Sequence, residues 1–221
     1  MNDIRGDLLA RVAALDLGDP AESWESVTRL AEAAPLARVP GSVRHLEELP
    51  ALPAETPITP SAVLVPLVDR PDGLTILLTR RTDHLVVHAG QISFPGGRSE
   101  PGDRSPVETA LRESEEEIGL ERAKVAVLAR LDNYLVGTGY RITPVLGLIR
   151  PPLDLRPDPF EVADIFEVPL DFALDPANYR KDSRLVNGME RRFNVLEYGG
   201  YYIWGATASI LVSLRFALVG R

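Results

Sequence analysis

The chain has 221 residues, 45% of them hydrophobic and 25% charged, so a globular domain with a sizeable core is expected. The formal net charge of −8 argues against nucleic acid or an anionic membrane as the main partner. The lack of cysteine excludes disulfides, thiolate catalysis and cysteine-ligated zinc, and fits a reducing compartment. The most apolar stretch, Ile203 to Leu214, is too short to span a bilayer. We therefore expect a soluble, cytoplasmic protein.

Residues 1–60 are expected to form a helical extension that ends in a proline-rich arm. Apolar residues at helical spacing predict two short helices, one through Ile4 and Val12 and the other through Trp24 and Leu30. Four prolines between Pro50 and Pro60 exclude a regular helix there. The extension has two candidate roles, formation of a homodimer and covering of a ligand pocket. The main domain is expected to span residues 61–221.

The main domain begins with apolar, β-rich runs. Ala62–Asp69 and Leu74–Arg80 are joined by a Pro-Asp-Gly turn, which favours a hairpin. Further strands are predicted at 124–131, 141–149, 164–170, 189–198 and 201–204, and a final helix over 206–219. One acidic helix interrupts these strands. The pattern predicts the α/β class, with a mixed sheet between helices.

The acidic helix has clear start and stop signals. Ser105-Pro106-Val107-Glu108 is a capping box with proline at the first helical position. Gly119 stands where a left-handed C-cap residue belongs. These signals predict a helix from about Pro106 to Ile118.

The faces of this helix follow from a rotation of ~100° per residue. The predicted core face consists of Val107, Leu111, Ser114 and Ile118. Glu113, Glu116 and Glu117 fall on a separate arc, while Arg112 can reach Glu108 and Glu116. Carboxylates at this spacing repel one another, so the arc is either a solvated acidic face or a cation site.

The preceding loop favours a cation site. Phe94-Pro95-Gly96-Gly97 ends an apolar strand with two glycines, which let the backbone approach a ligand closely. Hard divalent cations take oxygen ligands such as carboxylates and a glycine carbonyl. Mg²⁺ also keeps several waters and bridges to phosphates. The residues therefore predict a Mg²⁺ site, with Mn²⁺ as the alternative ion, open to a phosphorylated small molecule.

These residues resemble the Nudix hydrolases. The family's box, G-x5-E-x7-R-E-U-x-E-E-x-G-U with U aliphatic, corresponds to Gly97, Asp103 and the run from Arg112 to Leu120. Asp103 replaces the first glutamate, eight residues rather than seven precede Arg112, and Ser114 replaces an aliphatic residue.

The longer box is typical of the coenzyme A pyrophosphatase branch of this family. The upstream signature of that branch, LLTxRSxxxRxxxGxxxFPGG, resembles residues 77–97. Thr82 stands in place of its serine and Val86 in place of its second arginine. The runs 139–149, 161–170 and 201–211 also resemble this branch, so the resemblance extends over about residues 61–214.

The resemblance implies a Nudix-type α/β/α sandwich and Mg²⁺-dependent hydrolysis of a diphosphate linked to a nucleoside. From coenzyme A the products are 4'-phosphopantetheine and adenosine 3',5'-bisphosphate. Glu113 and Glu117 are the expected metal ligands, with Glu116 on a second ion or acting through water. The carbonyl of Gly97 completes the set, and Arg112 holds a box carboxylate in place.

The resemblance leaves the general base open between a box glutamate and Glu161, which lies in a later loop. Substrate contacts are expected from Arg80, Arg81, Arg98 and the backbone of Gly96.

Two other functions stay open. The first is a Nudix hydrolase for ADP-ribose, NADH or a nucleoside triphosphate, which Val86 favours. The second is a catalytically inactive Nudix domain that senses a ligand, although the box glutamates are all retained.

Overall fold

The computed structural model describes residues 10–12, 21–25, 57–85, 88–136, 139–186 and 189–219. The strands are β1 (Thr59–Arg70), β2 (Gly73–Arg81), β3 (Ile92–Ser93), β4 (Gly96–Arg98), β5 (Val125–Arg130), β6 (Tyr134–Leu135), β7 (Tyr140–Ile149), β8 (Val162–Pro169), β9 (Tyr179–Val186), β10 (Met189–Tyr198) and β11 (Tyr201–Trp204). The helices are α3 (Pro106–Ile118), α4 (Leu170–Leu174) and α5 (Gly205–Val219), with 3-10 turns η2 (Arg122–Lys124) and η3 (Pro176–Asn178).

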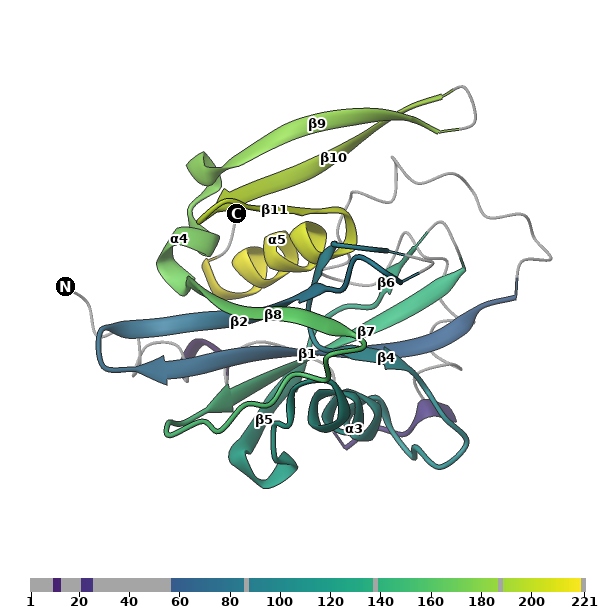
Figure 1. Cartoon of the computed structure of the whole chain (residues 1–221), viewed down its shortest axis with the longest axis vertical. Helices are drawn as coiled ribbons and strands as arrows, with labels where there is room; N and C mark the ends of the chain where they lie inside the picture. Colours follow the sequence, from purple (N-terminus) through teal and green to yellow (C-terminus); the bar gives the residue numbers. More distant parts are fainter. Residues whose placement is uncertain are drawn as a thin grey trace.

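The elements stack in four layers. Strands β1 to β8 form a mixed sheet, here called sheet A, with the order β3-β2-β1-β7-β5; β4 pairs with β1, β6 with β7 and β8 with β2. Helix α3 covers one face of sheet A and α5 the other, and the sheet β9-β10-β11, here called sheet B, lies beyond α5 (Figure 1). The predicted α/β class, with a mixed sheet between helices, is confirmed.

The centre of sheet A is buried on both faces, because β1 and β7 pair in parallel along their whole length. Alternate residues of β1 enter two cores. Leu64 contacts the core under α3, whereas Val65 and Leu67 contact the core under α5. The strand β1 thereby anchors the metal-site helix to the rest of the domain.

The described parts of the N-terminal extension pack on both of these cores. Val12 is buried in the core under α5, and Arg11 Nη1 donates to Leu218 O at 2.8 Å. Trp24 packs against the core under α3, and its Nε1 donates to Thr109 Oγ1 at 3.2 Å. The rest of the two predicted helices lies outside the described residues, and the boundary at residues 60/61 stays a prediction.

The last strand and helix lie where they are predicted: β11 spans Tyr201–Trp204, and α5 starts at Gly205, one residue before the predicted start. Gly205 has a φ of +63°, which lets the chain turn sharply from strand to helix. Within the described ranges, no helix has the length and apolarity needed to cross a bilayer.

Candidate metal centre

Helix α3 has the predicted limits and caps. The Ser105 side chain accepts from Glu108 N, Pro106 is the first helical residue, and Gly119 is left-handed with a φ of +67°. The capping box is only half formed, because the Glu108 carboxylate accepts from Arg104 N at 2.8 Å rather than from the N-cap amide. These local contacts fix where the helix begins and ends.

The buried face of α3 differs from the predicted core face. Ser114 and Ile118 of the predicted core face are buried, but so are Ala110 and Glu117, whereas Val107 and Leu111 are half-buried against the same core. The helix is thus rotated so that Glu117 faces sheet A. The three glutamates do not form one acidic surface.

Two glycines of β4 make room for the helix carboxylates. A Cβ on Gly97 would lie 2.6 Å from Glu113 Oε1, and a Cβ on Gly96 would lie 2.4 Å from Ala62 O. Gly96 also has a φ of +147°, which favours glycine. Any side chain at Gly97 would therefore displace Glu113, and any side chain at Gly96 would collide with β1.

The backbone of Gly96 faces the site. Gly96 N donates to Glu117 Oε2 at 3.0 Å. In the β1–β4 ladder, backbone hydrogen bonds are made two residues before and two residues after the Ala62–Gly97 pair. Hydrogen-bonded pairs alternate with non-hydrogen-bonded pairs in an antiparallel ladder, so Ala62 and Gly97 form a hydrogen-bonded pair. The Gly97 carbonyl, predicted as a metal ligand, is therefore directed at β1. Of the two glycines, Gly96 is the one whose amide contacts a helix carboxylate, and the role of the Gly97 carbonyl as a metal ligand stays a prediction.

Arg112 is the centre of a fixed network, and its side chain is only 12% exposed. Its Nε and Nη2 bind the two oxygens of Asp103 at 3.1 and 2.9 Å, and Nη2 also donates to Arg98 O at 2.9 Å. Its Nη1 lies 2.9 Å from Glu116 Oε2 and 3.1 Å from Glu113 Oε1. These contacts fit the predicted positioning role of Arg112.

Asp103 is a residue whose importance the sequence did not reveal beyond its place in the motif. Burial by itself would raise its pKa, but hydrogen bonds from Arg112, Glu100 N and Thr109 hold the pKa below the ordinary value. Asp103 therefore stays ionised and anchors the guanidinium.

Glu113 and Glu117 are the two carboxylates that converge below the glycines. The Glu117 side chain is 7% exposed, and burial raises its pKa to about 8 despite the hydrogen bond from Gly96 N. Burial also raises the pKa of Glu113, against the opposing effect of Arg112. Such carboxylates need more positive charge than their present neighbours supply.

Glu116 shares Nη1 of Arg112 with Glu113, and it is the most exposed of the three box glutamates. Its side chain is 60% exposed and bound to Arg112. Across the described part of the chain, no three acidic or histidine side chains are gathered closely enough to hold a metal ion. Of the three predicted carboxylate ligands, Glu117 is the most buried and Glu116 the most exposed, and the assignment of all three as metal ligands stays a prediction.

Glu161 lies near the pair, held there by the loop that precedes β8. Asp158 N donates to Glu117 O at 2.8 Å, so the loop binds the last turn of α3. Thr82 N donates to Glu161 O at 3.0 Å, and Thr82 Oγ1 donates to Phe160 O at 2.7 Å. A hydroxyl is what this contact requires, and threonine supplies it as serine would.

Arg81 lies between the acids of the helix and the loop. Its Nη1 is 3.7 Å from Glu117 Oε1, and its Nη2 is 3.8 Å from Glu161 Oε2. Because strand residues alternate, Arg80 points to the opposite face of sheet A, where it pairs with Asp83 at 3.7 Å.

Arg98 also lies away from the carboxylates, with its guanidinium over the Tyr140 ring at 5.0 Å and its Nη2 hydrogen-bonded to the Tyr140 hydroxyl. Of the three arginines predicted to contact substrate, the structure brings only Arg81 to the carboxylates. Val86 lies outside the described residues.

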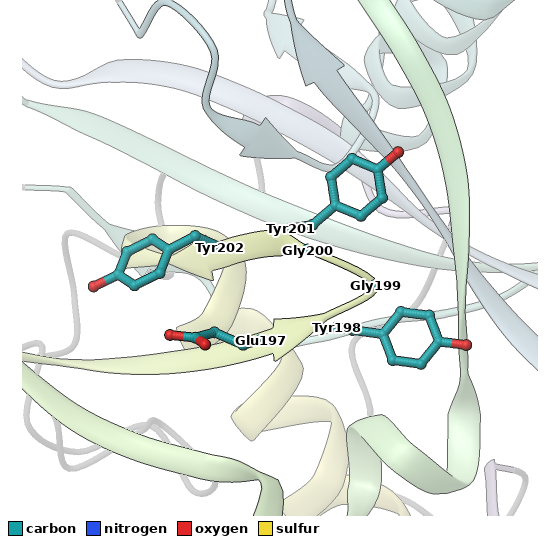
Figure 2. A pocket seen from close by; sticks show the side chains of 6 residues that line it. All are labelled: Glu197, Tyr198, Gly199, Gly200, Tyr201 and Tyr202. Carbon is teal, nitrogen blue, oxygen red and sulfur yellow. The ribbon is translucent and has the colours of Figure 1, made fainter.

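A surface hollow lies elsewhere, at the β10–β11 turn. Figure 2 shows its lining residues, Glu197 to Tyr202, with Tyr198 and Tyr201 on one side and Glu197 and Tyr202 on the other. Tyr201 stacks on Phe166 with ring centroids 3.6 Å apart, on the α5 side of sheet A. The hollow contains a single carboxylate and lies on the opposite side of sheet A from α3, so it offers no comparable chemistry.

The residues present fit a divalent cation. Glu117 is buried and Glu113 half-buried, both have raised pKa values, and Glu117 accepts from the backbone of Gly96 while Glu113 lies against Gly97. Oxygen donors of this kind suit Mg²⁺ or Mn²⁺. A divalent cation held next to an arginine is an arrangement that suits the binding of phosphoryl groups.

The sequence comparison specifies the family. The NUDIX domain profile matches residues 58–186, and the chain belongs to the Nudix hydrolases. Enzymes of this family act on nucleoside diphosphate derivatives and generally use divalent metal ions such as Mg²⁺.

Relatives named "Uncharacterized Nudix hydrolase NudL" occur in Yersinia pestis (strain Pestoides F) and Yersinia pseudotuberculosis serotype O:1b (strain IP 31758). Each is 42% identical over 151 residues, which cover 68% of this chain and 75% of the relative.

Solved structures with partial overlap include a Caenorhabditis elegans Ap4A hydrolase complex (TM-score 0.44, 18% identity, 50% of this chain and 80% of that one). Another is DR0079 from Deinococcus radiodurans (TM-score 0.45, 13% identity, 69% of this chain and 80% of that one). The family assignment rests on the sequence match.

Proposed function

We propose that this Nudix hydrolase cleaves the diphosphate of coenzyme A or its acyl derivatives, giving 4'-phosphopantetheine, or its acyl form, and adenosine 3',5'-bisphosphate. The observation that carries the hydrolytic part is the arrangement of Glu117, which is buried and accepts from Gly96 N, and Glu113, which is half-buried against Gly97, with Arg81 beside Glu117. The preference for coenzyme A is supported by the resemblance of residues 77–97 to the signature of that branch.

Two parts of that signature take part in the site. Arg81 is the signature arginine, and it reaches Glu117 and Glu161. Thr82 holds the loop that carries Glu161. The signature therefore has a structural link to the carboxylates, which a chance resemblance would lack.

Each residue of the site has a proposed role. Glu113 and Glu117 hold the divalent ion, and the amide of Gly96 holds the Glu117 carboxylate. Arg112 positions Glu113 by fixing its carboxylate. When bound, the ion neutralises diphosphate oxygens and makes water a better nucleophile.

Glu161 is the proposed general base. Its side chain is 48% exposed, so water can reach it, and the backbone around it is fixed by Thr82 and Asp158. Glu116 is the weaker candidate, because Arg112 binds its carboxylate at 2.9 Å.

A second candidate function is hydrolysis of another nucleoside diphosphate derivative, such as ADP-ribose or NADH, or of a deoxynucleoside triphosphate. Val86 favours it, because the signature arginine at that position is missing. An inactive, ligand-sensing domain is disfavoured by the intact arrangement of Glu113, Glu117 and Arg112.

A substrate panel separates these functions. Turnover of coenzyme A, acetyl-coenzyme A, ADP-ribose, NADH and dATP is measured with Mg²⁺ and with Mn²⁺, with products identified by mass spectrometry in ¹⁸O water. We expect the highest kcat/KM on a coenzyme A species, with the label in one of the two phosphate products. An equal or higher kcat/KM on another substrate refutes the coenzyme A preference, and no turnover with any of them refutes the proposed hydrolase activity.

A further inference from the structure

The two arginines of the site differ in how fully they are bound. Arg112 donates hydrogen bonds to Asp103, Glu116 and a backbone carbonyl, all at 3.1 Å or less. Arg81 lies 3.7 and 3.8 Å from its two carboxylates, beyond hydrogen-bonding distance. Among the described residues, its buried Nε has no hydrogen-bond acceptor. Arg112 is therefore locked in place, whereas the donors of the Arg81 side chain remain unused.

The Arg81 side chain is 25% exposed, but its Nε is buried, and leaving a buried donor unpaired is costly. An anion with several oxygens is a suitable partner for such a guanidinium. A diphosphate supplies such oxygens and accepts two parallel hydrogen bonds from one guanidinium. The position of Arg81, between the proposed metal ligand Glu117 and the proposed base Glu161, is where a diphosphate held by the ion would be expected to reach.

Arg81 also competes with a metal ion for the same carboxylate. With no ion bound, the positively charged guanidinium of Arg81 lies 3.7 Å from Glu117 Oε1. A divalent ion that binds Glu117 is repelled by that charge. The repulsion disappears if Arg81 turns to an anionic ligand.

We propose that Arg81 couples the two binding steps of the site: it lies beside Glu117 while the site is empty and moves to the diphosphate when metal and substrate bind. Each ligand then strengthens the binding of the other, beyond their direct attraction. This inference rests on the proposed function, because it assumes a diphosphate ligand and a divalent ion held by Glu117. It adds a positioning role for a residue that the motif alone marks only as a substrate contact.

The test measures binding, not turnover. Mn²⁺ affinity is measured by electron paramagnetic resonance with and without methylenediphosphonate, a diphosphate analogue that is not hydrolysed. The ratio of the two affinities is the coupling factor, and by linkage Mn²⁺ must change the affinity for methylenediphosphonate by the same factor.

We expect Arg81→Met to reduce the coupling factor on the order of tenfold, a typical size for such coupling. Arg81→Lys should give an intermediate value, because it keeps the charge without the paired donors. Arg80→Met is the matched control: it removes the same charge from the adjacent position on the opposite face of sheet A, so the coupling factor should stay within about twofold.

A coupling factor in Arg81→Met within twofold of wild type overturns the inference. Circular dichroism and thermal unfolding verify that each variant is folded, and Arg81→Lys decides the question if Arg81→Met does not fold. The substrate panel tests the proposed function independently of the role of Arg81. Inactivity of the wild type on every substrate refutes the proposed function, whereas an unchanged coupling factor in an active enzyme refutes only the role of Arg81.

Discussion

Replacing Glu117 by glutamine is expected to stabilise the metal-free protein while it removes most of the activity. Glutamine has nearly the same shape and keeps an oxygen to accept from Gly96 N, a contact of 3.0 Å. It removes the buried negative charge, whose burial raises the Glu117 pKa from the ordinary 4.5 to about 8. At ~1.4 kcal/mol per pKa unit, this interval sets an upper limit of about 5 kcal/mol on the gain, and relaxation of the site leaves about 2–3 kcal/mol.

The stability gained by Glu117→Gln depends on pH, and the direction of this dependence follows from the raised pKa. Between pH 4.5 and about 8 the folded protein keeps a proton on Glu117 that the unfolded chain has lost. The free energy of unfolding of the wild type therefore falls as pH rises through this window. The raised pKa of Glu113 adds to the same trend. Glu117→Gln lacks the contribution of Glu117, so its advantage should be near zero at pH 5 and largest at pH 8.

Urea unfolding in EDTA at pH 5, 6.5 and 8 measures these free energies directly. Glu115→Gln is the matched control, since Glu115 is an exposed residue of the same helix, paired with Arg122 at 2.7 Å. That control should change stability by less than ~1 kcal/mol at every pH. Saturating Mg²⁺ should reverse the order and make the wild type the more stable protein. If Glu117→Gln shows no advantage at pH 8 in EDTA, the burial argument for this site is wrong.

Three further predictions concern the residues around the carboxylates. Arg112→Ala should lower the free energy of unfolding by about 3–5 kcal/mol, because Asp103, 7% exposed, loses its cation, and Arg112→Lys should not restore it. Gly97→Ala should reduce kcat at least about tenfold, because its Cβ would displace the nearest helix carboxylate. Gly102→Ala, whose Cβ would meet nothing within 4 Å, should be nearly neutral in the same assay. Thr82→Val should lower kcat by removing the hydroxyl that holds the loop carbonyl, whereas Thr82→Ser should keep it.

The limits of α3 could be predicted because they depend on local contacts. Ser105, Pro106 and Gly119 each act within one turn of the helix end, so their effect is present in the sequence. The rotation of the helix depends on contacts that are distant in the chain. Only the packing against β1 and β4 shows that Glu117 is buried while Glu116 stays exposed.

The different positions of two adjacent arginines could have been foreseen from the sequence. Arg80 and Arg81 are adjacent in a predicted strand, and strand residues alternate between faces. They could not both reach the same site. The register of β4, which turns the Gly97 carbonyl toward β1, depends on a pairing with no local signal.

Strand β9 was missed for a different reason. Its sequence, YRKDSRLV, is rich in charge and has no apolar alternation. The strand is held by pairing with β10 and by cross-strand contacts such as Arg180 Nη2 to Glu197 Oε1 at 2.6 Å. Such pairs are visible only when both strands are in place.

The layered arrangement of the domain limits how it can be shortened. The family match ends at residue 186, yet the wall that covers the second face of sheet A comes from later residues, among them the fully or almost fully buried Leu196, Ile203, Leu211 and Leu214. A fragment that ends with the matched range would expose the apolar second face of sheet A to water. Such a fragment is expected to aggregate and to be inactive. Screens that clone only the matched domain would therefore score an active enzyme as insoluble.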